Sequence, residues 1–274
     1  MDSVVSEVGV VSEARCAQLA AARMKLAKSG KSPNALAEES RLRICEWIYR
    51  WGYSSSEHIQ HLLGRTSGGY AQKLTRQGIL IQTKTASGKP AAIFSLTAIG
   101  LQIAEHQAGC LYRYSELDPH KISQQLIRHN LLAQEITMKA IRSGKITGYE
   151  TERMFVADRD QLGIKRPDVV WLTSSGQRLG IEIELSAKWG RDLDEFVLGI
   201  ARGLAESAEQ SAKYNRFVVA SDSWAIIDRY VQAVSPGAIL NSWKKNERKH
   251  WVVDKKRQVP DWLAGKVDFQ FLEV

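Results

Sequence analysis

The first stretch of the chain with regular hydrophobic spacing predicts three helices, beginning near residue 39. The apolar positions of the first helix recur three and four residues apart: Leu42, Cys45, Ile48 and Tyr49. Ser54–Glu57 is typical of a capping box at the start of a second helix. After a break at Gly64, Thr66 or Ser67 can cap a third helix, which Gly78 ends.

Two short strand-like segments follow and predict a β-hairpin. They are Ile79–Thr83 and Ala92–Leu96, joined by a loop with glycine and lysine, and 97–106 predicts a closing helix. Three helices and a hairpin are typical of a winged helix, whose third helix enters the DNA major groove while its wing contacts phosphates. We therefore expect these DNA-binding residues: Ser67, Gln72, Lys73, Arg76, Lys84 and Lys89. The alternatives are an ordinary solvated helix face and a winged helix that docks proteins.

The remainder alternates helical and strand patterns, which predicts a mixed sheet with helices packed on its faces. The expected elements are a long helix over 118–143, strands over 147–156, 166–172 and 180–185, a helix over 192–214, and strands over 216–220 and 267–271. The fold class is therefore α+β. We expect a flexible or helical arm over 1–38, a winged helix over 39–108 and the mixed-sheet domain over 109–274.

Three carboxylates lie on the predicted hairpin around the turn Ser174–Gly176. A three-residue loop that ends in glycine fixes the pairing so that paired residue numbers add to 350, which sets Asp168 opposite Glu182. Strand alternation turns Glu182, Glu184 and, if the strand continues, Lys188 to the face opposite the isoleucines. We expect the three carboxylates to converge.

Converging carboxylates repel one another unless a cation lies between them. Oxygen ligands prefer hard cations, so the pattern predicts Mg²⁺ or Mn²⁺ held by Asp168, Glu182 and Glu184. Such a site suits phosphodiester hydrolysis, with Lys188 steadying the attacking water or the developing charge. The alternative is a solvent-facing sheet whose acids are paired with Lys188 or Lys165.

Charge favours a polyanionic partner, because Lys and Arg outnumber Asp and Glu by 38 to 30. The basic segment Asn241–Arg257 carries Lys244 and Lys245 among tryptophans, which suits single-stranded DNA or else a solvated loop over buried indoles. The three cysteines form no CxxC pair, so neither a disulfide framework nor a zinc cluster is indicated. No apolar run is long enough for a membrane span, and we expect a cytoplasmic protein that binds no membrane.

The α-β-β-β-α-β order resembles the PD-(D/E)xK, or restriction-endonuclease-like, superfamily. Pro167-Asp168 precedes the second strand, and Glu182-x-Glu184 lies on the third. The resemblance implies that Asp168 and Glu182 hold the metal. Glu184 stands where the family usually has lysine, so Lys188 is the candidate replacement cation. An acid from the first helix, Glu135, is the candidate supporting residue, with Glu152 on the first strand as the other.

A winged helix followed by such a core is similar to the replication-relaxation proteins and the MobC-type relaxases of mobilisable elements. The resemblance spans most of residues 39–220. It implies sequence-specific DNA binding and metal-dependent nicking at a transfer origin in conjugative plasmid mobilisation, with double- and single-stranded DNA and relaxosome proteins as partners. The alternatives are a catalytically inactive DNA-binding accessory, which Glu184 permits, and a defence or transposon endonuclease. His129 is expected to be a core histidine rather than a residue of the cleft.

Overall fold

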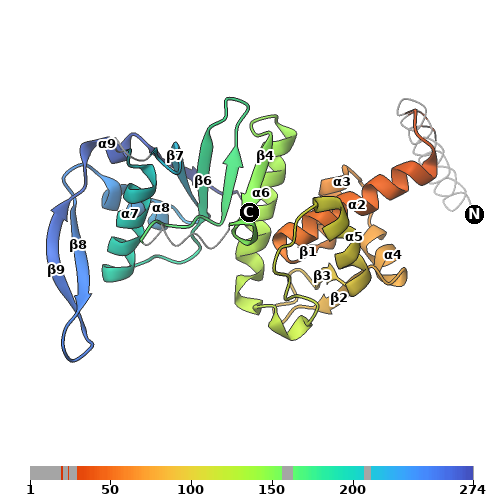
Figure 1. The fold of residues 1–274 in the computed structure, drawn as a ribbon, viewed down its shortest axis with the longest axis horizontal. Helices are drawn as coiled ribbons and strands as arrows, with labels where there is room; N and C mark the ends of the chain where they lie inside the picture. Colours follow the sequence, from red (N-terminus) through yellow and green to blue (C-terminus); the bar gives the residue numbers. More distant parts are fainter. Residues whose placement is uncertain (1–19, 21–23, 25–29, 156–162, 207–210, 274) are drawn as a thin grey trace, which may run out of the picture.

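The computed structural model describes residues 20, 24, 30–155, 163–206 and 211–273. Most of the flexible or helical arm expected over 1–38 lies outside these ranges. The described chain combines helices with a three-stranded, a five-stranded and a two-stranded sheet, which confirms the α+β class. Figure 1 shows the helices and small sheet of the N-terminal unit on one side of the five-stranded sheet. Within the described ranges, none of the helices has the length and apolar character that a bilayer span requires.

Helices α2 (Pro33–Trp51), α3 (Ser56–Leu63) and α4 (Tyr70–Arg76) open the N-terminal unit. α2 begins earlier than its apolar spacing indicates, because Ser32 accepts a hydrogen bond from the Ala35 amide and Pro33 is preorganised for the first turn. α3 is capped by Ser55, as the Ser-rich run predicts. The cap expected for α4 at Thr66 or Ser67 is wrong, because α4 starts after Gly69 without a side-chain cap.

A small antiparallel sheet completes this unit, in the order β1-β3-β2. Its strands are β1 (Ser54–Ser55), β2 (Leu80–Lys84) and β3 (Ala92–Leu96), and α5 (Ala98–Ala108) follows them. Both strands of the expected hairpin are therefore present within a residue of their expected bounds. The short strand before α3 pairs with β3 and was not predicted.

The long helix expected from residue 118 is shorter. Asp118 caps only the 3-10 turn η1 (Pro119–Lys121), the 3-10 turn η2 (Gln124–Leu126) follows, and α6 runs over Ile127–Arg142. The other elements of the second unit are β4 (Gly148–Thr151), η3 (Glu152–Met154), β5 (Val169–Leu172), β6 (Arg178–Ile183), α7 (Gly190–Leu204), β7 (Arg216–Ser221), α8 (Trp224–Val234), α9 (Asp261–Ala264) and β10 (Val267–Phe271). α7 thus ends well before the expected Tyr214.

The five-stranded sheet is mixed and has the order β10-β7-β6-β5-β4. β4, β5 and β6 pair antiparallel, whereas β6, β7 and β10 pair parallel. One face packs against α6, with Val169 and Ile181 in that core. The other face packs against α7 and α8, with Val170 and Phe217 in that core.

The segment after α8 forms a β-hairpin, for which the sequence pattern predicted no strands. Its strands are β8 (Ile239–Lys245) and β9 (Trp251–Gln258), paired antiparallel as a sheet of their own. Figure 1 shows this hairpin projecting beyond α7 at the end of the molecule farthest from the N-terminal unit.

The two units share one hydrophobic core, and Gln134 of α6 lies at their junction. Its buried side chain accepts hydrogen bonds from Trp47 Nε1 (2.9 Å) and Ser54 Oγ (2.8 Å) and donates one to the Tyr53 carbonyl (2.8 Å). Side chains of α2 and α4 belong to the same core cluster as those of α6, β5 and β6. The N-terminal unit is therefore packed firmly against the sheet domain.

Candidate active site

The hairpin β5–β6 has the predicted register. Val169 pairs with Ile181 and Leu172 with Arg178, so paired numbers add to 350 as expected. The turn also has the predicted geometry, because Gly176 adopts a φ of 78°, in the left-handed region that glycine enters at least cost. Asp168 and Glu182 are next in this register, just beyond the last ladder pair.

The faces of β6 are also as predicted, but its acids are buried. Ile181 and Ile183 pack into the core under α6. Glu182 and Glu184 lie on the opposite face and are only 4% and 3% exposed. The alternative of a solvent-facing sheet is therefore wrong about solvent exposure for these two glutamates, but its pairing of the acids with Lys165 and Lys188 is confirmed, as buried charges require.

Asp168 is held by the backbone of β6 and by a histidine. Its Oδ2 accepts a hydrogen bond from the Ile183 amide at 2.7 Å and lies 3.2 Å from His129 Nε2. Burial alone would lower the pKa of His129, but the hydrogen bond and charge of Asp168 outweigh it and raise that pKa to about 9. His129 Nδ1 faces Asn130 Oδ1 at 3.1 Å, so both ring nitrogens meet an acceptor, as an imidazolium requires.

Glu182 has one partnered and one unpartnered oxygen. Lys165 Nζ lies 2.5 Å from Oε1, whereas the buried Oε2 has no hydrogen-bond partner among the described residues. Burial, and after it the negative charge of Asp168, raises the pKa of Glu182 to about 8. Without a cation at Oε2 this carboxyl therefore tends to hold a proton.

Glu184 belongs to a separate ion pair. Its carboxylate contacts Lys188, which follows β6 in the connection to α7. The ammonium groups of Lys188 and Lys165 lie 4.8 and 5.6 Å from the ring centroid of Phe196 on α7. One aromatic ring thus lies close to both lysines that neutralise the buried glutamates.

The expected three-carboxylate metal site is not assembled. In the part of the chain that the structure describes, no group of three or more His, Cys, Asp or Glu side chains is arranged to hold a metal ion. Glu184 forms an ion pair with Lys188, so Asp168 and Glu182 remain as the candidate metal ligands. Magnesium commonly uses one or two carboxylates and completes its shell with water and phosphate, so this pair, with its unpartnered oxygen, still fits Mg²⁺ or Mn²⁺.

Glu135 does not support this site. Its carboxylate pairs with Lys139 one turn along α6, at 2.7 Å, and lines a shallow cavity beside the C-terminal residues Gln270–Glu273. The helix instead presents His129 to Asp168. The expectation of a purely structural core histidine is therefore corrected, because His129 contacts the site directly.

A cavity of about 620 Å³ opens over the lysines of the site. Lys165, Lys188, Arg166 and Arg202 line it, together with Phe196 and, from β8, Trp243. Asp192 and Glu195 also contribute, yet basic groups predominate on its wall. Asp168, Glu182 and Glu184 do not line the cavity, but Lys165 and Lys188 line it and contact Glu182 and Glu184, so an anion in the cavity would lie beside these ion pairs.

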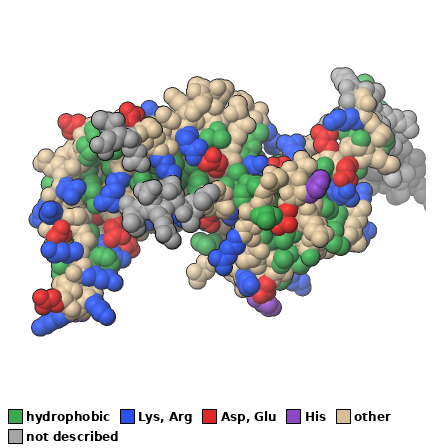
Figure 2. Space-filling view, viewed as in Figure 1, with side chains coloured by type: hydrophobic (Ala, Val, Ile, Leu, Met, Phe, Trp, Pro, Cys, Tyr) green, Lys and Arg blue, Asp and Glu red, His purple; other side chains and the backbone are tan. Residues whose placement is uncertain are grey.

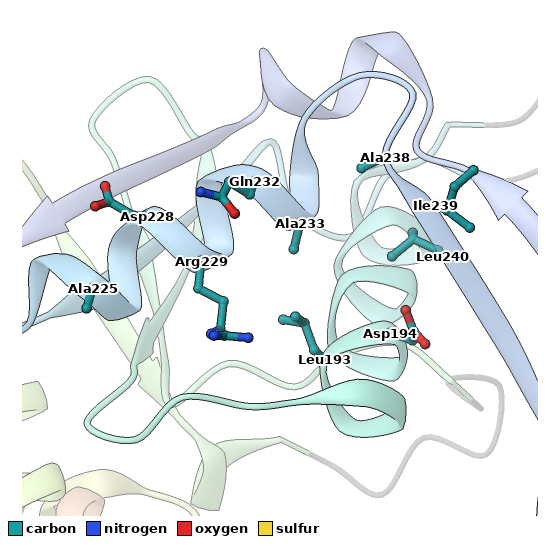
Figure 3. Close-up of a pocket in the computed structure, with 10 residues that line it drawn as sticks. All are labelled: Leu193, Asp194, Ala225, Asp228, Arg229, Gln232, Ala233, Ala238, Ile239 and Leu240. Carbon is teal, nitrogen blue, oxygen red and sulfur yellow. The ribbon is translucent and has the colours of Figure 1, made fainter.

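A second cavity, of about 390 Å³, lies where α7, α8 and β8 meet. Figure 3 shows Leu193, Arg229 and Leu240 pointing into it from these three elements. It includes none of the buried acids described above, and it marks the root of the β8–β9 hairpin.

The DNA-binding residues expected in the N-terminal unit are all exposed. The set comprises Ser67 before α4, Gln72, Lys73 and Arg76 on α4, and Lys84 and Lys89 at and after the end of β2. Lys73 and Arg65 lie beside the ring of Tyr70. Lys244 and Lys245, at the end of β8, are exposed as well. These positions are compatible with nucleic-acid contact.

No family model matches the chain, and comparison with curated proteins and with solved structures found no match either.

Proposed function

We propose that this chain is a sequence-specific DNA-binding protein that nicks DNA, with a winged helix as its recognition unit and a PD-(D/E)xK-type core as its hydrolytic unit. The observation that carries the proposal is that half-buried Asp168 lies opposite buried Glu182 in the hairpin register. Glu182 Oε2 has no partner among the described residues, and Oε1 contacts Lys165, which lines a basic cavity. The register of the pair follows from the hairpin, as in the family that the sequence resembles.

The N-terminal unit supports the recognition half of this proposal. α4 follows α3 closely and is followed by the β2–β3 hairpin, which is the order of a winged helix. Gln72, Lys73 and Arg76 are exposed on α4, and Lys84 and Lys89 are exposed on the hairpin. A helix of this kind reads base edges, while hairpin lysines contact phosphates without reading sequence.

The side chains around the acid pair have distinct proposed roles. Mg²⁺ or Mn²⁺ held by Asp168 and Glu182 would polarise the scissile phosphate and lower the pKa of a bound water. Lys165 and Lys188 neutralise phosphate charge that enters the cavity, and Phe196 keeps the site partly dry, which strengthens those interactions. His129 fixes the orientation of Asp168.

The setting that we propose is conjugative mobilisation, at a transfer origin and alongside relaxosome proteins, on the resemblance to the MobC-type relaxases. The second candidate function is a DNA-binding accessory without catalysis. The ion pair of Glu184 with Lys188 favours it, because it places a neutralised acid where the family has its lysine.

Nicking of supercoiled plasmid DNA separates the two functions. We expect the purified chain to convert supercoiled plasmid to open circles with Mg²⁺ or Mn²⁺ and to stop when EDTA is added. Asp168→Ala and Glu182→Gln should each reduce the rate by at least about a hundredfold, as loss of a metal ligand does. Glu135→Gln is the matched control and should nick like the wild type, since Glu135 pairs with Lys139 and lines a different cavity.

Sequence recognition is tested with a DNA duplex that the wild-type chain selects from a pool of random sequences. Arg76→Ala should weaken binding to that duplex by about 1–3 kcal/mol if Arg76 contacts a base edge. Binding without nicking by the wild-type chain would establish the accessory role, and equal binding of selected and unselected duplex would refute recognition by α4.

A further inference from the structure

The β8–β9 hairpin, Ile239–Gln258, is here named the basic arm, and its hydrogen-bonded anchor lies at its root. Asp194 of α7, itself 7% exposed, accepts hydrogen bonds from Trp243 Nε1 (2.9 Å) and Asn241 Nδ2 (3.1 Å). Leu240 adds a buried apolar contact at the root. Beyond Trp243 most of the residues of both strands are exposed, so the outer half of the arm buries little of its own surface.

The arm is strongly basic from its root to its tip. Residues 244–257 contain seven basic side chains, which are Lys244, Lys245, Arg248, Lys249, Lys255, Lys256 and Arg257. They contain two acids, Glu247 and Asp254, and Asp254 is already paired with Lys244 at 2.7 Å. Figure 2 shows Lys and Arg along the arm as far as its tip. A partner with a regular row of negative charges fits this surface.

Exposed tryptophan rings contact cationic side chains on the side of the arm that faces α7. Lys245 and Trp251 are paired across the strands, and the Arg191 guanidinium of α7 lies 4.5 Å from the Trp251 ring centroid. Trp189, 65% exposed, carries Arg229 of α8 over its ring. Aromatic and cationic groups therefore alternate from α8, past the start of α7, to the arm.

This surface is continuous with the cavity over the acid pair. Ser242 and Trp243, at the root of the arm, line the same cavity as Lys188 and Arg166. A chain of phosphates in the cavity would therefore leave it along the arm.

We propose that the basic arm and the adjoining start of α7 bind an unpaired nucleic-acid strand and guide it into the cavity. The inference rests on the proposed function for the identity of the polyanion, but not on catalysis. A single strand fits better than a duplex, because it offers bases to Trp251 and Trp189 and phosphates to the cations between them. A duplex would offer these indoles only its phosphate backbone.

The test is binding of a labelled single strand about 20 nucleotides long, and of the duplex of the same sequence, by fluorescence anisotropy in EDTA with the full chain. The arm variant is Lys245→Gln, Arg248→Gln and Lys256→Gln together, all at exposed positions. At about 50 mM salt it should bind the single strand ten- to a hundredfold more weakly than the wild type. The slope of log affinity against log salt concentration should be shallower by about two, since each lost phosphate contact removes about 0.7.

The matched control has the same loss of charge elsewhere. Lys121→Gln, Arg142→Gln and Lys145→Gln are exposed changes near the two ends of α6, on the other face of the sheet. This variant should stay within about threefold of the wild type, as a change in net charge alone would. An arm variant no weaker than this control would overturn the proposal.

The preference for an unpaired strand is tested by Trp251→Ala. It should weaken single-strand binding about tenfold and leave duplex binding within about twofold, because stacking requires exposed bases. Equal losses on the two probes overturn the assignment to an unpaired strand. Binding is measured in EDTA, so a wild-type chain that binds through the arm but never nicks refutes only the nicking proposal.

Discussion

His129 and Glu182 both hold protons more tightly than such side chains do in water, and Asp168 contributes to both shifts. Asp168 raises the pKa of His129 to about 9 against the opposing effect of burial. Burial and then Asp168 raise the pKa of Glu182 to about 8. A folded state that binds more protons than the unfolded chain loses stability as the pH rises. The site should therefore weaken the fold in alkaline solution.

The histidine provides the first prediction. The raised pKa of His129 stabilises the fold fully below its ordinary value of 6.5, and this contribution is lost as the pH rises towards 9. Urea unfolding should show that the free energy of unfolding of the wild type falls between pH about 6.5 and about 9.5. His129→Gln should reduce this fall by about 2 kcal/mol.

His58 is the control for this experiment. It is buried, with Ser55 Oγ at its Nδ1 and the Leu131 carbonyl at its Nε2, and burial lowers its pKa below 6.5. Its effect on stability therefore lies on the acid side, where stability is lost as the pH falls. His58→Gln should leave the alkaline loss unchanged, and an alkaline loss that survives His129→Gln in full would contradict the assignment.

The register of the acid pair could be predicted from the sequence, and Lys165 and Lys188 could be named as candidate partners, but which lysine pairs with which acid could not. Gly176 fixes the turn, and period-two alternation fixes the face, so Asp168 and Glu182 follow from local rules. Lys165 reaches Glu182 only because the segment before β5 is hydrogen-bonded to α7, through the Lys165 amide and the Gly199 carbonyl at 3.0 Å. That contact joins elements far apart in the chain, and no spacing rule encodes it.

At the scale of elements, α7 sets the position of Lys165. A Cβ at Gly199 would lie 2.9 Å from the Lys165 backbone nitrogen, closer than packed atoms approach. The absence of a side chain at Gly199 thus lets the segment carrying Lys165 lie against the helix and reach Glu182.

Gly199→Ala provides the second prediction. It should lower the free energy of unfolding by about 1–3 kcal/mol, because the Lys165 segment has to move away from the helix. Chemical denaturation measures this loss. Gly148→Ala is the control, since a Cβ there would make only ordinary contact with Leu172 at 3.5 Å, and it should change stability by less than about 1 kcal/mol. Equal stability of the two variants would show that the close approach is relieved without cost.

Elements with one buried face were predictable, whereas the basic arm was not. β5 and β6 carry apolar runs that a strand pattern detects. β9 is exposed along nearly its whole length. Its apolar residues Trp251–Val253 are consecutive and the rest are polar, so the period-two signal is absent. The start of α6 was misplaced for a related reason, since Asp118 and Pro119 form a valid helix start that here serves only a 3-10 turn.

At the scale of the molecule, the two units behave as one body because they share a core. Gln134 is fully buried and satisfies Trp47, Ser54 and the Tyr53 carbonyl across the junction. Asn130, one turn earlier on α6, donates to the Tyr53 hydroxyl at 3.0 Å. Removal of these contacts would leave polar groups unpaired on both sides.

Gln134→Leu provides the third prediction. It should lower the free energy of unfolding by about 3 kcal/mol, because three polar groups lose their partner. Gln102→Leu, an exposed change on α5, should stay within about 0.5 kcal/mol of the wild type. Calorimetry of the wild-type chain should show one cooperative transition, and two resolved transitions would contradict a shared core.

Helix α6 joins the two ends of the proposed activity. Asn130 and Gln134 donate hydrogen bonds to the N-terminal unit, while His129, the residue next to Asn130, contacts Asp168. If the chain nicks DNA, the fixed distance between the two units sets the number of base pairs between the recognised sequence and the broken bond. That number should stay constant when the intervening sequence is changed.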